Sequence, residues 1–165
     1  MLIFTDASFG YKPNMAGVGA IIIDQSKEYH IGAYTNKCRD NNIAEIAAIA
    51  FALKYVADNQ ISDKSKDKTL TVITDSSYAI QRINNKSPAR SEFEDYCLKY
   101  ISEFMKHTKL KVKFMQIKGH THDNTKFSYF NNMADEIAGQ YRYLGIHQYE
   151  NKFAMNVINN KKFSR

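Results

Sequence analysis

Apolar and polar residues alternate along this 165-residue chain in a pattern that predicts a mixed α/β domain. The first third contains three apolar segments typical of strands: the run that begins at Leu2, then Gly17–Ile23 and Glu28–Thr35. The turn sequence "DQSK" (Asp24–Lys27) joins the last two. Such short connections favour an antiparallel meander.

The rest of the chain predicts helices that alternate with two more strands. The residue types favour Asn41 or Asn42 as the N-cap of the first helix. The order β-β-β-α-β-α-α-β-α predicts an antiparallel half joined to a parallel half. The expected elements are a helix at Asn42–Val56, a polar loop at Asn59–Lys68, a strand ending at Asp75, a helix capped by Ser76 or Ser77, a helix at Glu92–His107, a strand at Lys109–Ile117, a loop at Gly119–Phe130 and a helix at Asn132–Tyr143.

Two of the predicted strands end in the same way, with threonine, aspartate, a small residue and serine. "LIFTDAS" contains Asp6, and "ITDSS" contains Asp75. If these strands are parallel neighbours, both aspartates lie at their carboxyl ends, where open α/β sheets place their sites. Two carboxylates about 4 Å apart repel by roughly 4 kcal/mol at an effective dielectric near 20. A divalent cation relieves that repulsion, and carboxylate oxygens suit Mg²⁺ or Mn²⁺.

Two further acids lie in helical segments. Glu45 occurs in the apolar segment "NNIAEIAAIAFAL", and Asp135 ends the motif "NNMAD". Glu45 has a second interpretation, because an acid on the exposed side of a helix near its N-terminus is favoured by the helix dipole. The interpretation as a site residue depends on whether the carboxylates converge.

Charge and composition exclude few classes of function. The net charge is +6 with a pI near 9.2, which fits either simple solubility or a polyanionic partner. The apolar run Ile43–Ala57 contains Glu45 and Lys54 and is too short to span a bilayer, so we expect no membrane association. The absence of a signal-peptide pattern and the two isolated cysteines, Cys38 and Cys97, lead us to expect free thiols and a cytoplasmic location.

Taken together, the acidic motifs and "KGH" (Lys118–His120) resemble ribonuclease H type I in order and spacing, from Met1 to about Tyr143. The resemblance implies the fold of that family, a mixed five-stranded sheet in the order 3-2-1-4-5 flanked by helices. This order agrees with the elements inferred from the pattern. We therefore expect a catalytic domain at residues 1–144 and a C-terminal extension of unknown placement at residues 145–165.

The resemblance also implies an activity. Asp6, Glu45, Asp75 and Asp135 would be the ligands of two Mg²⁺ ions, with Mn²⁺ as a substitute. The enzyme would be an endonuclease that hydrolyses the RNA strand of an RNA–DNA hybrid, leaving 5′-phosphate and 3′-hydroxyl ends. His120 would assist proton transfer or product departure. We expect a monomer whose partner is the hybrid.

Substrate contacts follow from the same resemblance. Asn41 and Asn42 match a pair at the minor groove of the hybrid, although either could instead cap the helix. Lys12 and Ser77 stand where some members have Asn and Gln, so their contacts must differ in detail. The expected substrate-binding residues are Ser8, Lys12, Asn41, Asn42, Ser76 and Ser77.

The chain departs from the family pattern in several places. Asp40 lies where members often have a threonine that helps to hold a DNA phosphate, and an acid there repels phosphate unless Lys37 or Arg39 takes over. The basic insertion that some members carry is missing at Asn84–Glu92, and so is an N-terminal hybrid-binding module. The loop before Asp135 is long, which leaves Asp123 as an alternative fourth ligand.

Three other functions compete with this interpretation. A catalytically silent nucleic-acid-binding module would not require four acids. A phosphoaspartyl protein would need a second acid where Ser8 stands, and its parallel sheet conflicts with the antiparallel start. A zinc site through His120 and His122 finds no further His or Cys at ligand spacing.

Overall fold

The computed structural model describes residues 1–66, 68–85, 88–118 and 125–150, with side chains up to residue 148. Its elements alternate as the sequence pattern predicts. In chain order they are β1 (Leu2–Tyr11), β2 (Asn14–Asp24), β3 (Lys27–Thr35), α1 (Asn41–Asp58), α2 (Ile61–Lys64), β4 (Thr69–Thr74), α3 (Ser77–Asn84), α4 (Glu92–His107), β5 (Lys111–Gln116) and α5 (Lys126–Glu150).

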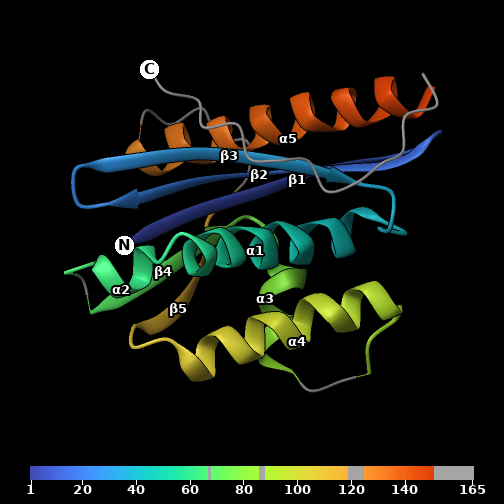
Figure 1. Ribbon diagram of the computed structural model, residues 1–165. Coiled ribbons are helices and arrows are strands. Elements are labelled where there is room, and N and C mark those ends of the chain that lie inside the picture. Colours follow the sequence, from blue (N-terminus) through green and yellow to red (C-terminus); the bar gives the residue numbers. More distant parts are fainter. Residues whose placement is uncertain (67, 86–87, 119–124, 151–165) are drawn as a thin grey trace.

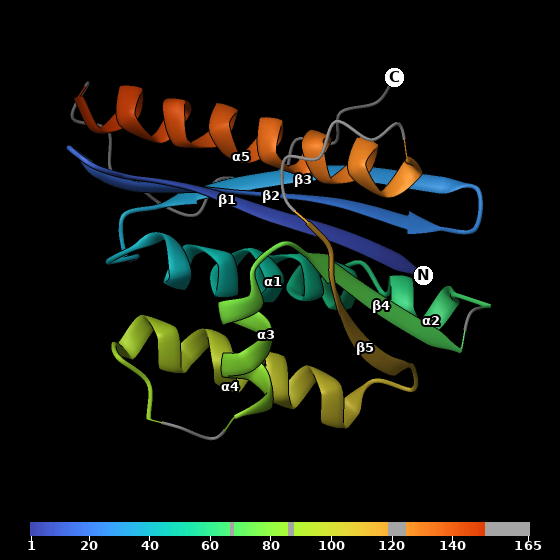
Figure 2. The same ribbon diagram turned by 180° about the vertical axis from the view of Figure 1, so that it is seen from behind.

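The five strands form one mixed sheet in the order β3-β2-β1-β4-β5. The pairs β1–β2 and β2–β3 are antiparallel, whereas β1–β4 and β4–β5 are parallel. Helix α5 covers one face of the sheet, while α1 lies on the other face with α4 packed outside it (Figure 1). Figure 2 shows the same three layers from behind. The predicted fold class and strand order are confirmed.

Several element boundaries differ from the prediction because tertiary contacts decide them. A short helix, α2, occupies part of the predicted polar loop, where it buries Ile61 in the core. Helix α1 is capped by Asp40 rather than by Asn41 or Asn42, since the Asp40 Oδ1 atom accepts a hydrogen bond from the Ile43 amide at 3.0 Å. Of the two caps predicted for α3, Ser76 is confirmed, because its hydroxyl accepts a hydrogen bond from the Ala79 amide at 3.1 Å.

Helix α5 is much longer than the predicted Asn132–Tyr143. It begins six residues earlier, and its first turn is held by Thr125, whose hydroxyl accepts from the Ser128 amide at 3.2 Å. Near its end, the Tyr34 hydroxyl donates to Gln148. The expected division at residue 144 falls within this helix, and residues 151–165 lie outside the described part of the chain. A separate extension therefore stays a prediction.

Three glycines allow α5 to approach the sheet closely. A Cβ atom on Gly17 would lie 1.9 Å from the Ala138 carbonyl oxygen, and one on Gly19 would lie 2.2 Å from the Ala134 carbonyl oxygen. A Cβ on Gly32 would meet the Tyr141 ring at 2.3 Å. Backbone therefore packs directly against backbone, and these strand positions accept no side chain.

The described residues contain no helix long and apolar enough to cross a membrane. Both cysteines, Cys38 and Cys97, are buried and free, as the sequence led us to expect.

We predict that Gly19→Ala lowers the free energy of unfolding by roughly 1–3 kcal/mol or more, because the added methyl group forces the helix and the sheet apart. Gly139→Ala is the matched control. Gly139 lies in α5, the helix that Gly19 faces, and nothing lies within 4 Å of the position that its Cβ would take. This substitution should therefore stabilise the protein by about 0.5–1 kcal/mol. Urea unfolding followed by circular dichroism measures both, and equal effects of the two substitutions would contradict the close approach.

Candidate metal centre

The pairing of β1 with β4 brings the two aspartates together. The parallel register places Phe4 beside Ile73, so Asp6 and Asp75, each two residues further along, lie side by side. Asp75 directly follows β4, as predicted, but Asp6 lies within β1, which continues to Tyr11 and pairs Asp6 with Gly19 of β2, so the expectation that the first strand ends at this aspartate is wrong. The Gln116 side-chain amide, from the end of β5, donates to the Asp75 carbonyl oxygen at 3.4 Å.

Helix α1 adds the third carboxylate. It begins at Asn41 and packs against β1, and Glu45 lies four residues after its start. Carboxylate oxygens of Asp6, Glu45 and Asp75 all lie within 4.8 Å of one another. Glu45 is 5% exposed and Asp6 is 6% exposed, whereas Asp75 is half-buried. The interpretation of Glu45 as a solvated surface acid is therefore wrong.

Burial and mutual repulsion raise the pKa values of this cluster. Burial first, then the charges of Asp75 and Asp135, raise the pKa of Asp6 to about 8, although the Ala7 amide opposes this with a 2.7 Å hydrogen bond to Asp6 Oδ1. The pKa of Glu45 also lies well above its ordinary value, because it is buried and faces Asp6 and Asp75.

The donor set fits a hard divalent cation. Asn41 Nδ2 donates to Glu45 Oε1 at 3.3 Å, but Glu45 Oε2 is buried with no hydrogen-bond partner among the described residues. A buried carboxylate oxygen without a partner is costly, and a cation beside Asp6 and Asp75 would satisfy it. The three carboxylates could therefore hold a metal ion.

The fourth expected ligand lies close by. Asp135 is half-buried on α5, and its charge raises the pKa of Asp6, yet it stands outside the group whose oxygens lie within 4.8 Å. His120, His122 and Asp123 fall outside the described residues. Their roles, and the choice between Asp135 and Asp123, stay predictions.

The expected substrate-binding residues occupy segments that border the carboxylates in the sequence. Asn41 and Asn42 are exposed at the start of α1, and Lys12 is exposed in the turn between β1 and β2. Ser8 is partly buried on β1, whereas Ser77 is exposed on the first turn of α3. Their contacts with a substrate stay predictions.

Sequence reasoning missed the partner of Asp40. This residue pairs with Arg90, whose Nη1 lies 3.2 Å from Asp40 Oδ2 and whose guanidinium lies 4.9 Å from the centre of the Tyr78 ring. The Arg90 amide donates at 2.5 Å to Glu94, a fully buried residue that also binds Arg82 Nε at 2.9 Å. Arg90 therefore compensates the charge of Asp40, while a phosphate contact by Lys37 or Arg39 stays a prediction.

One sequence signal could have pointed to this network. "SEFE" has the spacing of a capping box, and the Ser91 hydroxyl does accept from the Glu94 amide at 3.1 Å. The Glu94 carboxylate, however, turns to the two arginines. The sequence gives no indication that Arg90 reaches a residue fifty positions away.

Comparison with protein families gives a decisive match. The family model of RNase H matches residues 1–143. The chain belongs to the RNase H family. A comparison with curated protein sequences found no match. The family and the antiparallel β1–β3 half also exclude the parallel sheet of a phosphoaspartyl receiver.

Solved structures share the fold of this RNase H domain. LC11-RNase H1, isolated from compost and crystallised with an RNA/DNA hybrid, matches with a TM-score of 0.68 and 20% identity over 88% of this chain and 98% of its own. RNase H1 of Halobacterium salinarum has a TM-score of 0.61 and 16% identity, covering 85% and 95%. Prototype foamy virus protease–reverse transcriptase has a TM-score of 0.65 and 23% identity, covering 86% of this chain and 20% of its own.

We predict that the metal-free RNase H domain loses stability as the pH rises from about 4 to about 8. The folded-state pKa of Asp6 is about 8, above its ordinary value, so over that interval the folded protein binds more protons than the unfolded chain. The free energy of unfolding should therefore fall with rising pH and level off above the folded pKa. Urea unfolding in EDTA at several pH values measures this slope.

Asp6→Asn should flatten the slope but leave the part due to Glu45, whose pKa is raised in the same direction. Asp63→Asn, which changes an exposed aspartate of α2, is the matched control and should keep the original slope. A slope that Asp6→Asn leaves unchanged would contradict the assignment of the effect to the cluster.

Proposed function

We propose that this RNase H domain is an endonuclease that hydrolyses the RNA strand of RNA–DNA hybrids and leaves 5′-phosphate and 3′-hydroxyl ends. The observation that carries the proposal is the convergence of Asp6, Glu45 and Asp75, with the buried Glu45 Oε2 atom left without a partner among the described residues. We further propose two divalent cations, Mg²⁺ or Mn²⁺, held by these acids and by Asp135.

The protein itself contributes preorganised carboxylates. When bound, such cations supply Lewis acidity at the scissile phosphate and lower the pKa of water, so that hydroxide is available near neutral pH. Because the pKa values of Asp6 and Glu45 are raised, protons compete with a cation for these carboxylates, so cation affinity should rise with pH. Asp75 is the most exposed of the three and is placed to face both solvent and substrate.

Recognition of the hybrid is proposed for the residues around this centre. LC11-RNase H1 was crystallised with an RNA/DNA hybrid, which supports this substrate class. The exposed Asn41 and Asn42 could donate to 2′-hydroxyl groups in the minor groove, the feature that distinguishes RNA from DNA. Because Arg90 compensates the charge of Asp40, a phosphate near the start of α1 would not be repelled by an unpaired carboxylate.

The cluster also bears on the alternative of a silent binding module. Three carboxylates within 4.8 Å of one another, two of them buried, destabilise the metal-free fold, as the raised pKa values of Asp6 and Glu45 indicate. This cost gives a binding module no advantage, whereas a metal-dependent nuclease uses such carboxylates as ligands, which supports the proposed nuclease. Cleavage measurements separate the two functions directly.

We predict that Asp75→Asn lowers Mg²⁺-dependent hybrid cleavage by about 10²–10³-fold or more, since it removes a carboxylate from the charge-stabilising centre. In EDTA the variant should unfold at the same or a slightly higher temperature, because like charges are relieved. Cleavage is measured on a 5′-labelled hybrid beside duplex RNA, duplex DNA and a phosphorylated small molecule. Near-normal turnover by the variant would remove Asp75 from the centre, and cleavage of the small molecule alone would overturn the proposed substrate.

We predict a milder effect for His120→Ala. A group that only assists proton movement contributes at or below the low end of general acid–base catalysis, which is about 10²-fold. Single-turnover cleavage of the hybrid measures the chemical step, and His122→Ala serves as the neighbouring control. A larger loss with His122→Ala than with His120→Ala would show that the "KGH" motif is assigned wrongly.

A further inference from the structure

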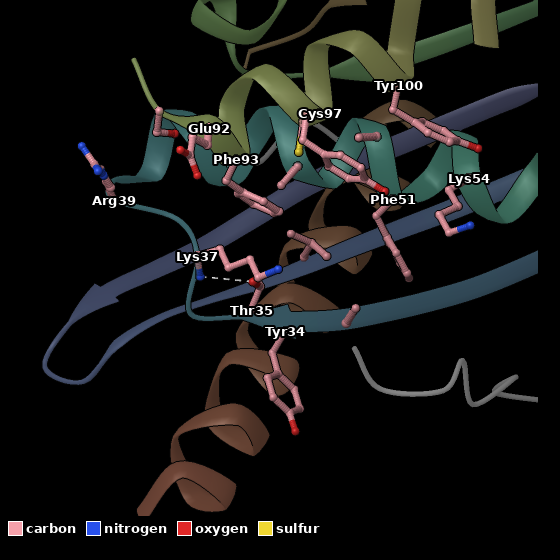
Figure 3. Close-up of a pocket in the computed structure, with 16 residues that line it drawn as sticks. Tyr34, Thr35, Lys37, Arg39, Phe51, Lys54, Glu92, Phe93, Cys97 and Tyr100 are labelled. Atoms are coloured by element: carbon pink, nitrogen blue, oxygen red, sulfur yellow. Dashed lines mark hydrogen bonds between the residues drawn. The ribbon is translucent and has the colours of Figure 1, made fainter. Parts of the chain in front are cut away.

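A groove of about 970 Å³ lies between β3, α1 and α4, on the side of the sheet that faces α1 (Figure 3). Residues from all three elements line it, together with Lys37 and Arg39 from the segment between β3 and α1. Helix α1 packs on β1 and β2, and α4 packs on α1, so the face of β3 stays uncovered between them. The groove is thus a consequence of the layer arrangement.

The groove is separate from the carboxylate centre. It is lined on α1 by Ala47, Ala50, Phe51 and Lys54. At 3.6 residues per turn, these positions lie roughly 140–240° around the helix from Glu45. They therefore form the opposite side of α1, and whatever binds there does not contact the acids.

Aromatic rings form the walls of this groove. Phe51 descends from α1, and Phe93 and Tyr100 face it from α4 (Figure 3). Tyr96, which is stacked on Phe93 with ring centroids 6.4 Å apart, is 59% exposed. Exposed aromatic rings around a concave apolar floor are typical of protein-binding sites.

The charges at the groove are mainly positive. Arg39 is exposed at one end, and the exposed Lys37 extends from there toward Thr35 and the middle of the groove (Figure 3). Within the described residues neither of them forms an ion pair. Lys54 stands at the other end, where it binds Asp58 at 2.9 Å. Glu92 is the one acidic residue in the lining, so three basic side chains face one acidic side chain around a mainly apolar and aromatic surface.

We propose that this groove binds an acidic, amphipathic peptide segment of a partner protein. One or two large apolar side chains of the peptide lie between Phe51 and Tyr96, and its carboxylates face Lys37, Arg39 and Lys54. Charge complementarity selects this occupant. A nucleic-acid strand also stacks on aromatic rings, but it binds grooves whose basic side chains follow its backbone, whereas this lining has three basic residues, of which Lys54 is already paired with Asp58.

The chain's own C-terminal residues are a poorer match. Residues 151–165 contain four basic side chains and no acidic one. Their charge has the same sign as that of the groove, which disfavours this segment as the occupant.

The test uses the full-length protein and a defined probe. The probe is a fluorescein-labelled nine-residue peptide with acidic residues on both sides of a leucine–phenylalanine pair. Fluorescence anisotropy should show saturable binding that weakens with salt. The same peptide with each acid replaced by its amide should bind at least about tenfold more weakly, because the charge contacts are lost.

Variants with matched controls locate the binding site. Lys37→Glu and Lys54→Glu should each weaken peptide binding about three- to tenfold, and Tyr96→Ala should do so about tenfold. Lys66→Glu makes the same charge change at an exposed lysine outside the groove lining, and Tyr143→Ala removes an exposed ring from α5. Both controls should bind as the unaltered protein does.

Four results would overturn the proposal, and the first three concern the full-length protein. These are no saturable binding of the acidic peptide, equal weakening by the control variants, and stronger binding of a nine-nucleotide single-stranded DNA that is lost in Lys37→Glu. Peptide binding that requires deletion of residues 151–165 would assign the groove to the chain's own terminus and would overturn the proposal as well. None of these outcomes depends on hybrid cleavage, so the test is independent of the proposed nuclease activity.

Discussion

The parallel pairing of β1 with β4 is the constraint on which the rest of this molecule depends. It places Asp6, within β1, beside Asp75, which follows β4, and α1 then brings Glu45 close to both. Hydrophobic packing on both faces of the sheet holds the three carboxylates together against their repulsion. The electrostatic repulsion among the three carboxylates therefore destabilises the fold, and either protons or a cation must offset it.

Local sequence was enough to predict that Asp6 and Asp75 meet. An apolar run followed by Thr-Asp appears in both β1 and β4, and the parallel pairing of these runs brings the two aspartates together, although β1 continues beyond Asp6 to Tyr11. This convergence is predictable because it depends on neighbouring residues and on a general rule of sheet topology. The strand order was expected from the resemblance to a known family, and the burial of Glu45 stayed open until the structure brought the carboxylates together.

Other features depend on contacts between distant segments, which no local pattern marks. The cap of α1 was open to prediction, since Asp40 is a favoured N-cap type next to Asn41, but its arginine partner was not, because Arg90 lies fifty residues further on. The length of α5 was underestimated, since its two ends are held by Thr125 and by Tyr34 on β3 rather than by a continuous apolar stripe. The groove beside α4 exists only once three elements are packed, so no pattern along the chain marks it.

The two glycines of β2 that contact α5 have a consequence for Asp135, the fourth expected metal ligand. Gly17 faces the Ala138 carbonyl and Gly19 faces the Ala134 carbonyl, and Asp135 lies between these two helix positions. No rotatable side chain separates helix from strand there, so the separation equals the thickness of two main chains in contact. The distance between the main chains at Asp135 and at Asp6 is therefore fixed by direct contact of α5 with the sheet. It changes only if the whole helix moves away from the sheet.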